Sequence, residues 1–576
     1  MQLDVNSTYH RTVHDEPADM QQTEDNLRKE SWKDWPNSAG FVGLKEHRGP
    51  LSLQVKGTIP AWAEGTLYRT GPGSNVVENT SRGTHYVSHW FDGFAHSHKF
   101  DIIPSSEAGG ATTVNYSSRR QSDELVESIR KKGWLTGVSF AQRSDPCLGI
   151  FAKATSVFQP APVNVNVAIH RDFPGVGSGR SESSGHRASN LVLTSDHFNM
   201  QSLDPDTLEP LASPNQTTLH PDLKGPLSCA HPQRDPKNGD MFNVNLQLGP
   251  SPTYRFFRVD ASTGETTIIA TLSEPGACPA YIHSMFLTEN YLVFCIPSSH
   301  LAWKGAKILW ERNILEAIKP FDKGNLCRWF VIDRRGGKGV VARFSTPASF
   351  FFHSVNAFEE YEYGNNNEQK TTIYLDYVGF QTTDIMLGLY YDVLLDRNDA
   401  TKKYWIEGDG YKNLNPSLVR YRFTLPPPSK KQTRREAAHA TGEQVFSIPN
   451  PHAGELPTIN PGYACRPYRY VYATCNRGVS NIADSLVRTD VQTREALIWC
   501  GPHSHCPGEP VFLPRPGATD EDDGVVLSVV LDGAAETSYL LCLDARTMTE
   551  TGRAEADFAI AVGLHGIHTS SVDKCE

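Results

Sequence analysis

The sequence is organised around one stretch, residues Ser349–Glu360, which reads SFFFHSVNAFEE. Three phenylalanines precede a single histidine, His353, and two carboxylates close the stretch. A continuous run of large apolar residues is typical of a strand that is buried on both faces. A lone histidine in such surroundings is usually an ordinary core residue, so His353 by itself does not indicate a metal site.

Three further histidines lie in similar surroundings. They are His231 in CAHP, His283 in YIHSMF and His565 in GLHG. Each lies at or beside an apolar, strand-like run, and the four histidines are separated by 52, 70 and 212 residues. Strand ends that are distant in sequence meet on a central axis when sheets are arranged radially. We therefore expect the four imidazoles to converge.

Short strands dominate the middle of the chain. They recur with turn signals from Leu191 to Leu543, for example at Tyr254–Val259 and Tyr291–Ile296, whereas long amphipathic helices are scarce. This pattern predicts an all-β protein, which could be a sandwich, a barrel or a propeller. Periodicity does not choose among the three, and no repeat of the Trp-Asp or kelch kind is present.

The chain of 576 residues is expected to form one large domain over residues 31–576. Residues 1–30 are polar and rich in acids, which predicts a disordered tail without an apolar signal segment. A proline-led, basic stretch near residues 425–441 has strand-like sequence on both sides and is predicted to be an inserted surface loop.

Composition narrows the possible partners and compartments. The formal net charge of −10 argues against nucleic acid, because phosphate binding needs a clustered basic face. No apolar run is long enough to predict a membrane span. The 11 cysteines contain no Cys-x-x-Cys pair, which favours reduced thiols. We expect a cytoplasmic monomer, with peripheral membrane contact as an open option.

Two other stretches attract attention. The pair Asp92–Gly93 signals a hairpin between aromatic strands. His96 and His98 follow on one face of the next strand, and we favour a structural role because Ser97 and Lys99 indicate a solvated opposite face. Further along, Trp134 and Leu135 lie in an apolar segment, which we interpret as core rather than as a lip that touches lipid.

The four-imidazole set has a definite chemistry. Neutral imidazoles without a thiolate suit Fe(II), Cu or Zn and leave coordination positions open, whereas structural zinc favours four closely spaced ligands, usually with cysteine. The second nitrogen of each ring needs a hydrogen-bond acceptor, commonly a carboxylate. Candidate acceptors are acids at apolar strand ends, although each could simply cap a loop: Asp196, Glu455 and Glu509.

The histidine segments resemble the carotenoid cleavage oxygenase family from about Trp35 to the C-terminus, most specifically in FHSVNAFE (residues 352–359) and GLHG (residues 563–566). The resemblance implies a seven-bladed β-propeller whose helices and loops cap the face over the metal. It also implies that non-haem Fe(II) is held by His231, His283, His353 and His565. Three glutamates that orient these histidines match Asp196, Glu455 and Glu509. Because aspartate is one methylene shorter, we expect its contact to be longer or water-bridged.

The resemblance further implies an activity, cleavage of a conjugated C=C bond of a carotenoid with O2 to give two aldehydes. The chain is most similar to the torulene-cleaving members, so torulene, a related carotene or an apocarotenoid is the expected substrate. Stilbenoid-cleaving relatives bind a phenol through a tyrosine and a lysine, and Tyr116 and Lys153 lie in the matching neighbourhood. An isomerase that uses the same site, or a propeller scaffold without metal, also stays open.

Overall fold

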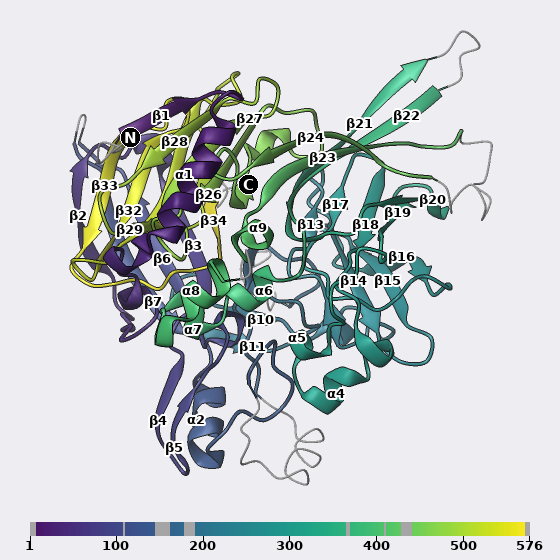
Figure 1. The fold of residues 1–576 in the computed structure, drawn as a ribbon, viewed down its shortest axis with the longest axis horizontal. Coiled ribbons are helices and arrows are strands. Elements are labelled where there is room, and N and C mark those ends of the chain that lie inside the picture. The colour runs from purple at the N-terminus through teal and green to yellow at the C-terminus, as the bar shows by residue number, and fades with distance from the viewer. Residues whose placement is uncertain are drawn as a thin grey trace.

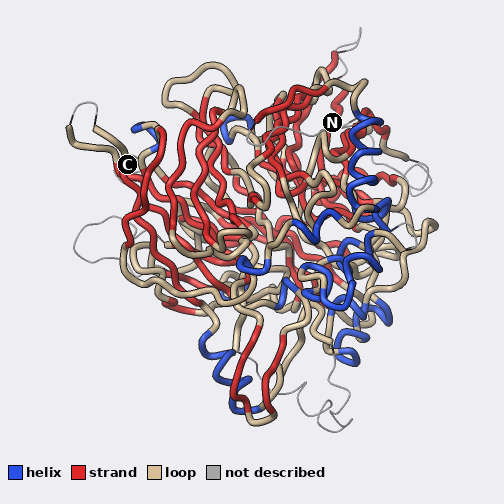
Figure 2. Tube along the Cα trace, turned by 60° about the vertical axis from the view of Figure 1, so that its left-hand side comes forward, coloured by secondary structure: helices blue, strands red, loops and turns tan. Residues whose placement is uncertain are grey.

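The computed structural model describes residues 7–107, 110–143, 162–177, 190–363, 369–407, 410–427 and 440–570. Strands are the commonest regular element in this part of the chain, and the helices are short and gather toward one side of the body (Figure 2). The predicted all-β class is therefore confirmed.

Five of the sheets in the described part of the chain contain four or five antiparallel strands each (Figure 1). The first contains β8 (Ala168–Arg171), β9 (Leu191–Thr194), β10 (Gln201–Leu203) and β11 (Pro210–Ala212). The second contains β12 (Leu227–Ser228), β13 (Gln233–Arg234), β14 (Met241–Gln247), β15 (Thr253–Val259) and β16 (Thr266–Leu272). The third contains β17 (Phe286–Leu287), β18 (Tyr291–Ile296), β19 (Cys327–Asp333) and β20 (Gly339–Thr346).

The fourth sheet contains β21 (Phe350–Tyr363), β22 (Gln369–Phe380), β23 (Ser417–Thr424) and β24 (Glu443–Pro449). The fifth contains β25 (Glu455–Thr458), β26 (Tyr470–Cys475), β27 (Ser485–Asp490), β28 (Ala496–Cys500) and β1 (Ser7–Arg11). Within these sheets, strands that follow one another in sequence pair with each other, which is the organisation of propeller blades. Some of the connections are long, such as those that carry helices between β18 and β19 and between β22 and β23.

The remaining large sheet joins the two ends of the chain. It contains β29 (His505–Pro507), β30 (Val511–Pro514), β31 (Gly524–Asp532), β32 (Thr537–Asp544), β33 (Glu550–Ala556), β2 (Leu51–Gly57), β7 (Thr113–Arg120), β6 (Ala95–Ile103), β3 (Gly65–Pro72) and β34 (His565–Thr569). β2 pairs with both β33 and β7, which makes one ten-stranded sheet, and β34 pairs with β3. The expected number of seven blades stays a prediction. A separate hairpin is formed by β4 (Val76–Thr80) and β5 (Gly83–Tyr86).

The expected disordered tail is wrong for most of its length. Residues 7–11 form β1, which adds to the edge of β28, and residues 16–28 form helix α1 (Glu16–Arg28). Leu27 of this helix is buried in the main core, and the Asn26 amide donates a hydrogen bond of 2.9 Å to the Arg477 carbonyl oxygen. Composition missed this segment because an edge strand is held by backbone hydrogen bonds, which any polar sequence can make.

The other α-helices among the described residues are α2 (Asp123–Lys132), α4 (Lys307–Glu311), α5 (Ile314–Ala317), α6 (Ile385–Gly388), α7 (Tyr391–Leu394), α8 (Ala400–Trp405) and α9 (Gly410–Leu414). Helices α6 to α9 lie together near the centre of the view in Figure 1. Their apolar residues Met386, Val393 and Trp405 belong to the same buried cluster as Phe350 and Phe352 of β21. They form the expected cap over the inner strand ends.

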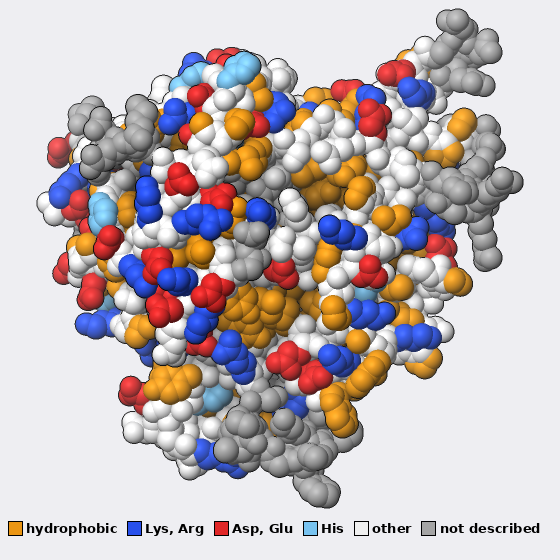
Figure 3. All heavy atoms as spheres, in the orientation of Figure 1, with side chains coloured by type: hydrophobic (Ala, Val, Ile, Leu, Met, Phe, Trp, Pro, Cys, Tyr) orange, Lys and Arg blue, Asp and Glu red, His pale blue; other side chains and the backbone are white. Residues whose placement is uncertain are grey.

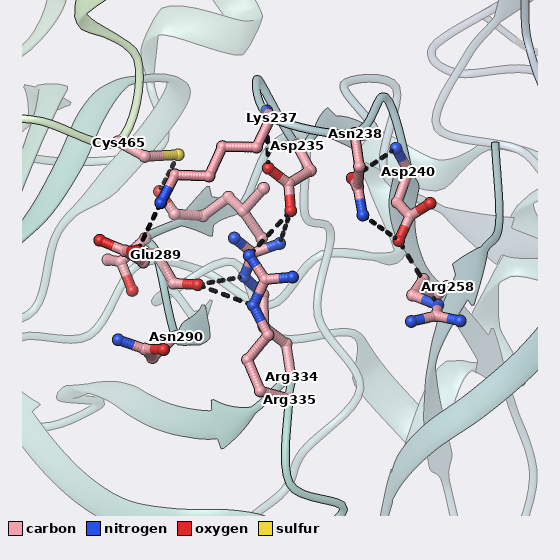
Figure 4. Close-up of polar contacts among 12 residues, drawn as sticks. Asp235, Lys237, Asn238, Asp240, Arg258, Glu289, Asn290, Arg334, Arg335 and Cys465 are labelled. Carbon is pink, nitrogen blue, oxygen red and sulfur yellow. Dashed lines mark hydrogen bonds and ion pairs between the residues drawn. The ribbon is translucent and has the colours of Figure 1, made fainter. Parts of the chain in front are cut away.

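A buried ion-pair network ties the second sheet to the third. The Asp235 carboxylate, just after β13, accepts from Arg334 Nη1 at 2.6 Å and from Arg335 Nη2 at 3.0 Å (Figure 4). The Nε atoms of both arginines donate to the carbonyl oxygen of Glu289, which follows β17. These contacts fix the short inner strands β13 and β17, which begin just after His231 and His283.

Other sequence expectations concern the surface. The predicted insertion near residues 425–441 connects β23 to β24, and its residues 428–439 lie outside the described part of the chain. No helix among the described residues is long and apolar enough to cross a membrane. Acidic and basic side chains are interspersed on the face drawn in Figure 3, around a central apolar area.

Deletion of residues 1–28 should destabilise the protein, because it removes an edge strand and the buried Leu27 side chain. We expect a thermal midpoint lower by about 2–5 °C, measured by differential scanning calorimetry. Deletion of residues 1–6 leaves β1 and α1 in place and serves as the control. Equal midpoints for the two deletions would contradict the structural role of this segment.

Candidate metal centre

The four histidines come from four different sheets and meet at the inner strand ends. His231 and His283 each lie two or three residues before a short inner strand, β13 and β17, whereas His353 lies within β21 and His565 begins β34. One ring nitrogen from each lies within 4.8 Å of the others. The predicted convergence of the four imidazoles is therefore observed.

Backbone contacts hold the ligand-bearing segments against one another. The His231 amide points to the His283 carbonyl oxygen at 3.4 Å. The Ser284 hydroxyl donates to the Phe352 carbonyl oxygen at 2.6 Å and accepts from the Ser354 amide at 2.9 Å. Neighbouring inner segments thus fix each other, and the rings need little adjustment to face a common point.

Each of the three predicted acids contacts one of these histidines. The Nδ1 atoms of His283, His353 and His565 lie 2.9, 2.5 and 2.7 Å from carboxylate oxygens of Asp196, Glu455 and Glu509, respectively. A ring N–H that donates to a carboxylate fixes the tautomer and leaves Nε2 as a bare acceptor.

The Asp196 contact is the longest of the three, as expected for the shorter side chain, but it is direct and does not need a bridging water. Its Oδ2 contacts His283 Nδ1 directly at 2.9 Å. The Asp196 carbonyl oxygen accepts from the Ser228 amide, and its Oδ1 accepts from the Ala230 amide at 3.1 Å. These bonds hold the loop after β9 close to the segment that carries His231. The backbone position of Asp196 thus brings its carboxylate within hydrogen-bond distance of His283, although the side chain is one methylene shorter than that of glutamate.

The ring nitrogens face one another in a way that fits a cation. Nε2 of His231 lies 3.2 Å from Nε2 of His283, and Nε2 of His353 lies 3.1 Å from that of His565. Burial holds the pKa values of His231 and His565 below their ordinary range, so both rings are neutral at pH 7. Because Nδ1 of both His353 and His565 donates to a carboxylate, their facing Nε2 atoms carry bare lone pairs that repel each other, and a metal ion between them removes the repulsion. Four imidazoles without a thiolate suit a divalent transition metal and leave positions open.

An apolar cavity adjoins the histidines on one side. His283, His353 and His565 line it together with aromatic and aliphatic side chains from β21, β22, the helical cap and two further segments, namely Phe91, Phe352, Phe380, Leu389, Trp405 and Leu564. His231 does not line the cavity, so the accessible side of the centre is the side of the other three rings.

Phe91 is a site residue that the sequence did not reveal. Its ring stacks on His283 with a centroid distance of 6.3 Å and meets Phe352 edge-on at 5.7 Å. Residues 90–92 form a 3-10 helix, η4 (Trp90–Asp92), rather than the expected hairpin. The Asp92 carboxylate accepts from the amides of Phe140 and Ala141 at 2.7 Å, which anchors the turn. Burial raises the Asp92 pKa to about 6.

His96 and His98 are buried, but the reason given for their role is wrong. Ser97 and Lys99 on the opposite face are buried as well, because β6 is a central strand covered on both sides. Lys99 pairs with Asp101 at 3.2 Å. Among the described residues, His96 and His98 belong to no group of three or more potential ligands. A structural role remains our interpretation.

Tyr116 and Trp134, which the sequence also singled out, lie away from the cavity. Tyr116 is buried in the core between β2, β6 and β7, and its hydroxyl contacts His98 Nδ1 at 2.9 Å. It does not line the cavity, so its predicted place near the substrate is wrong, and Lys153 lies outside the described residues. Trp134 is half-buried beneath the Arg312 guanidinium, which lies 4.8 Å from its ring centroid.

The architecture and the site together define a β-propeller protein with a four-histidine centre. The family model for the retinal pigment epithelial membrane protein matches residues 41–570. The torulene dioxygenase of Fusarium fujikuroi is 54% identical over 99% of both chains, and the carotenoid dioxygenase of Neurospora crassa is 47% identical over 98% of this chain and 96% of its own. The chain therefore belongs to the retinal pigment epithelial membrane protein family, the family of carotenoid oxygenases.

Solved structures support the propeller fold. A single-residue mutant of the Synechocystis apocarotenoid oxygenase gives a TM-score of 0.68 at 22% identity, covering 94% of this chain and 99% of its own. A cobalt-substituted form of the same enzyme gives a TM-score of 0.67.

Substitution of a candidate ligand should remove the metal. Purified wild-type protein should contain about one equivalent of iron, and His353→Ala should retain less than roughly a tenth of it, measured by inductively coupled plasma mass spectrometry. His300→Ala is the matched control, because His300 is buried outside the cluster. Full metal occupancy in His353→Ala would exclude His353 as a ligand.

Proposed function

We propose that this protein is a non-haem Fe(II) dioxygenase that cleaves a conjugated C=C bond of a carotenoid with O2 and forms two aldehydes. The observation that carries the proposal is a four-imidazole centre that opens into an apolar cavity. The 54% identity to a torulene dioxygenase supports torulene or a related carotene as the substrate.

The residues have separate tasks in this proposal. His231, His283, His353 and His565 would hold Fe(II), and Asp196, Glu455 and Glu509 would orient three of the rings. Bound Fe(II) would supply the binding and activation of O2 beside the alkene. The two oxygen atoms of O2 end in the two carbonyl groups, so the reaction needs no added proton or reductant. Phe91 and Phe352 would position the polyene by packing and keep water away from it.

The cavity lining favours a hydrocarbon. Three of the four asparagine side chains that line it, those of Asn450, Asn476 and Asn481, are occupied by protein partners. Asn450 bonds to the Asn476 backbone at 2.6 and 3.0 Å, and Asn476 donates to the carbonyl oxygens of Ser480 and Ile482. The Asn481 amide donates to the carbonyl oxygens of Val393 and Leu394. A substrate hydroxyl beside these groups would lose its hydration without a replacement partner.

Torulene should therefore be cleaved with a kcat/KM about tenfold or more above that of a dihydroxylated carotenoid of similar length. Aldehyde products are quantified by liquid chromatography and mass spectrometry, with 18O2 to trace oxygen into both fragments. Equal kcat/KM values would contradict the hydrocarbon preference. Cis isomers without aldehydes would support an isomerase, and cleavage of resveratrol alone would support a stilbenoid oxygenase.

We also propose that the protein works as a monomer that touches membranes through the surface of helix α4 and the turn η6 (Ala302–Gly305) that precedes it. Trp303, Leu309 and Trp310 are 61%, 55% and 71% exposed there, and Lys304 and Lys307 flank them. Exposed tryptophan beside lysine is typical of interfacial anchors. A water-insoluble substrate would enter from such a surface. Trp134, the residue considered first, is half-buried and less suited.

The double variant Trp303→Glu/Trp310→Glu should lower partition into phospholipid vesicles at least roughly fivefold, measured by flotation. Trp134→Glu is the control and should leave partition nearly unchanged. Unchanged flotation of the double variant would exclude this surface. Light scattering of the wild-type protein tests the monomer.

A further inference from the structure

The three carboxylates that contact the histidines are held by different groups. Glu509 accepts from Arg69 Nη1 at 3.1 Å and from the Gly566 amide at 2.8 Å, and Glu455 accepts from the Leu456 amide at 2.9 Å. Asp196 differs because the oxygen that faces its histidine is shared with a second side chain. Its Oδ2 lies 2.7 Å from the Tyr281 hydroxyl and 2.9 Å from His283 Nδ1.

The positions of these three groups make the Tyr281 hydroxyl a hydrogen-bond donor to Asp196. The Tyr281 oxygen also lies 3.2 Å from His283 Nδ1, so the three polar atoms form a compact triangle. The Nδ1–H of the neutral ring donates to Asp196, which leaves that nitrogen without a lone pair for the phenol. The single O–H of Tyr281 therefore donates to the carboxylate.

Tyr281 is rigidly placed for this contact. Its side chain is buried and packs edge-on against Phe140 at 5.2 Å and nearly parallel to Phe350 at 6.1 Å. Its amide donates to the Ser299 carbonyl oxygen, and the Ser299 hydroxyl donates back to the Tyr281 carbonyl oxygen at 2.6 Å. Tyr281 does not line the apolar cavity, so it acts without touching the polyene.

We propose that Tyr281 is a positioning residue of the metal centre, which holds the short Asp196 carboxylate in the place from which it orients His283. An aspartate has one torsion fewer than a glutamate and reaches the ring only from a narrow range of positions. The phenol and the Ala230 amide hold its two oxygens from different sides. This inference rests on the proposed function, because it assigns Tyr281 to the same metal centre.

The test compares Tyr281→Phe with Tyr254→Phe. Tyr254 is also fully buried, donates to the Cys278 carbonyl oxygen at 2.7 Å and accepts from the Ala280 amide, but it contacts none of the three carboxylates. Both variants lose one buried hydroxyl. The apo proteins are titrated with Co(II), and binding is followed by the visible absorption of the ion. Thermal midpoints confirm that both variants fold.

Tyr281→Phe should weaken Co(II) binding about tenfold and change its absorption spectrum, whereas Tyr254→Phe should stay within about twofold of the wild-type protein. At saturating Fe(II), Tyr281→Phe should lower kcat for torulene and leave KM unchanged. Unchanged Co(II) affinity in Tyr281→Phe, or equal losses in both variants, would overturn the role of Tyr281. Failure of the wild-type chain to bind metal would overturn the proposed function as well.

A double variant tests whether the phenol acts through the carboxylate. In an Asp196→Asn background, Tyr281→Phe should cause no further loss of Co(II) affinity, because the group that it positions is already altered. Additive losses would show that Tyr281 acts by another route and would overturn the proposal.

Discussion

The structure depends on bringing four imidazole nitrogens to within 4.8 Å of one another. The facing Nε2 lone pairs of His353 and His565 repel each other without a cation, so the rest of the fold has to maintain the arrangement. His231, His283, His353 and His565 come from four sheets, and bonds such as that of Ser284 to Phe352 hold neighbouring segments together. A radial arrangement of short strands brings distant parts of the chain to a common axis without long loops.

The carboxylates that contact the histidines would be balanced in charge by a bound cation and a buried arginine. Asp196, Glu455 and Glu509 place three carboxylates behind the rings, and Arg69 is a buried guanidinium that contacts one of them. A divalent cation together with Arg69 would balance these charges, which lowers the cost of burying them. The centre is therefore built from successive hydrogen bonds. Backbone amides and side chains such as Tyr281 donate to the carboxylates, and the carboxylates accept from the histidine rings and fix their orientation.

The cavity beside the centre needs the opposite property. Three of its asparagine side chains, those of Asn450, Asn476 and Asn481, are occupied within the protein, and helices α6 to α9 bring apolar residues over the inner strand ends. The protein combines a polar, charge-balanced metal centre with an apolar wall only a few ångströms away. This combination fits oxidation of a hydrocarbon that offers no polar group for recognition.

The sequence by itself determined the all-β class, the four histidines and their three acidic partners, because strand periodicity and the local segments around His353 and His565 carry that information. Tertiary structure decided the rest. It stacks the Phe91 ring on His283 and brings the Tyr281 hydroxyl within hydrogen-bond distance of the Asp196 carboxylate. It also buries Tyr116 in a hydrophobic cluster away from the cavity. It also ordered the N-terminal segment as an edge strand and helix. These outcomes depend on contacts between residues far apart in sequence and on backbone hydrogen bonds, which composition and local pattern do not encode.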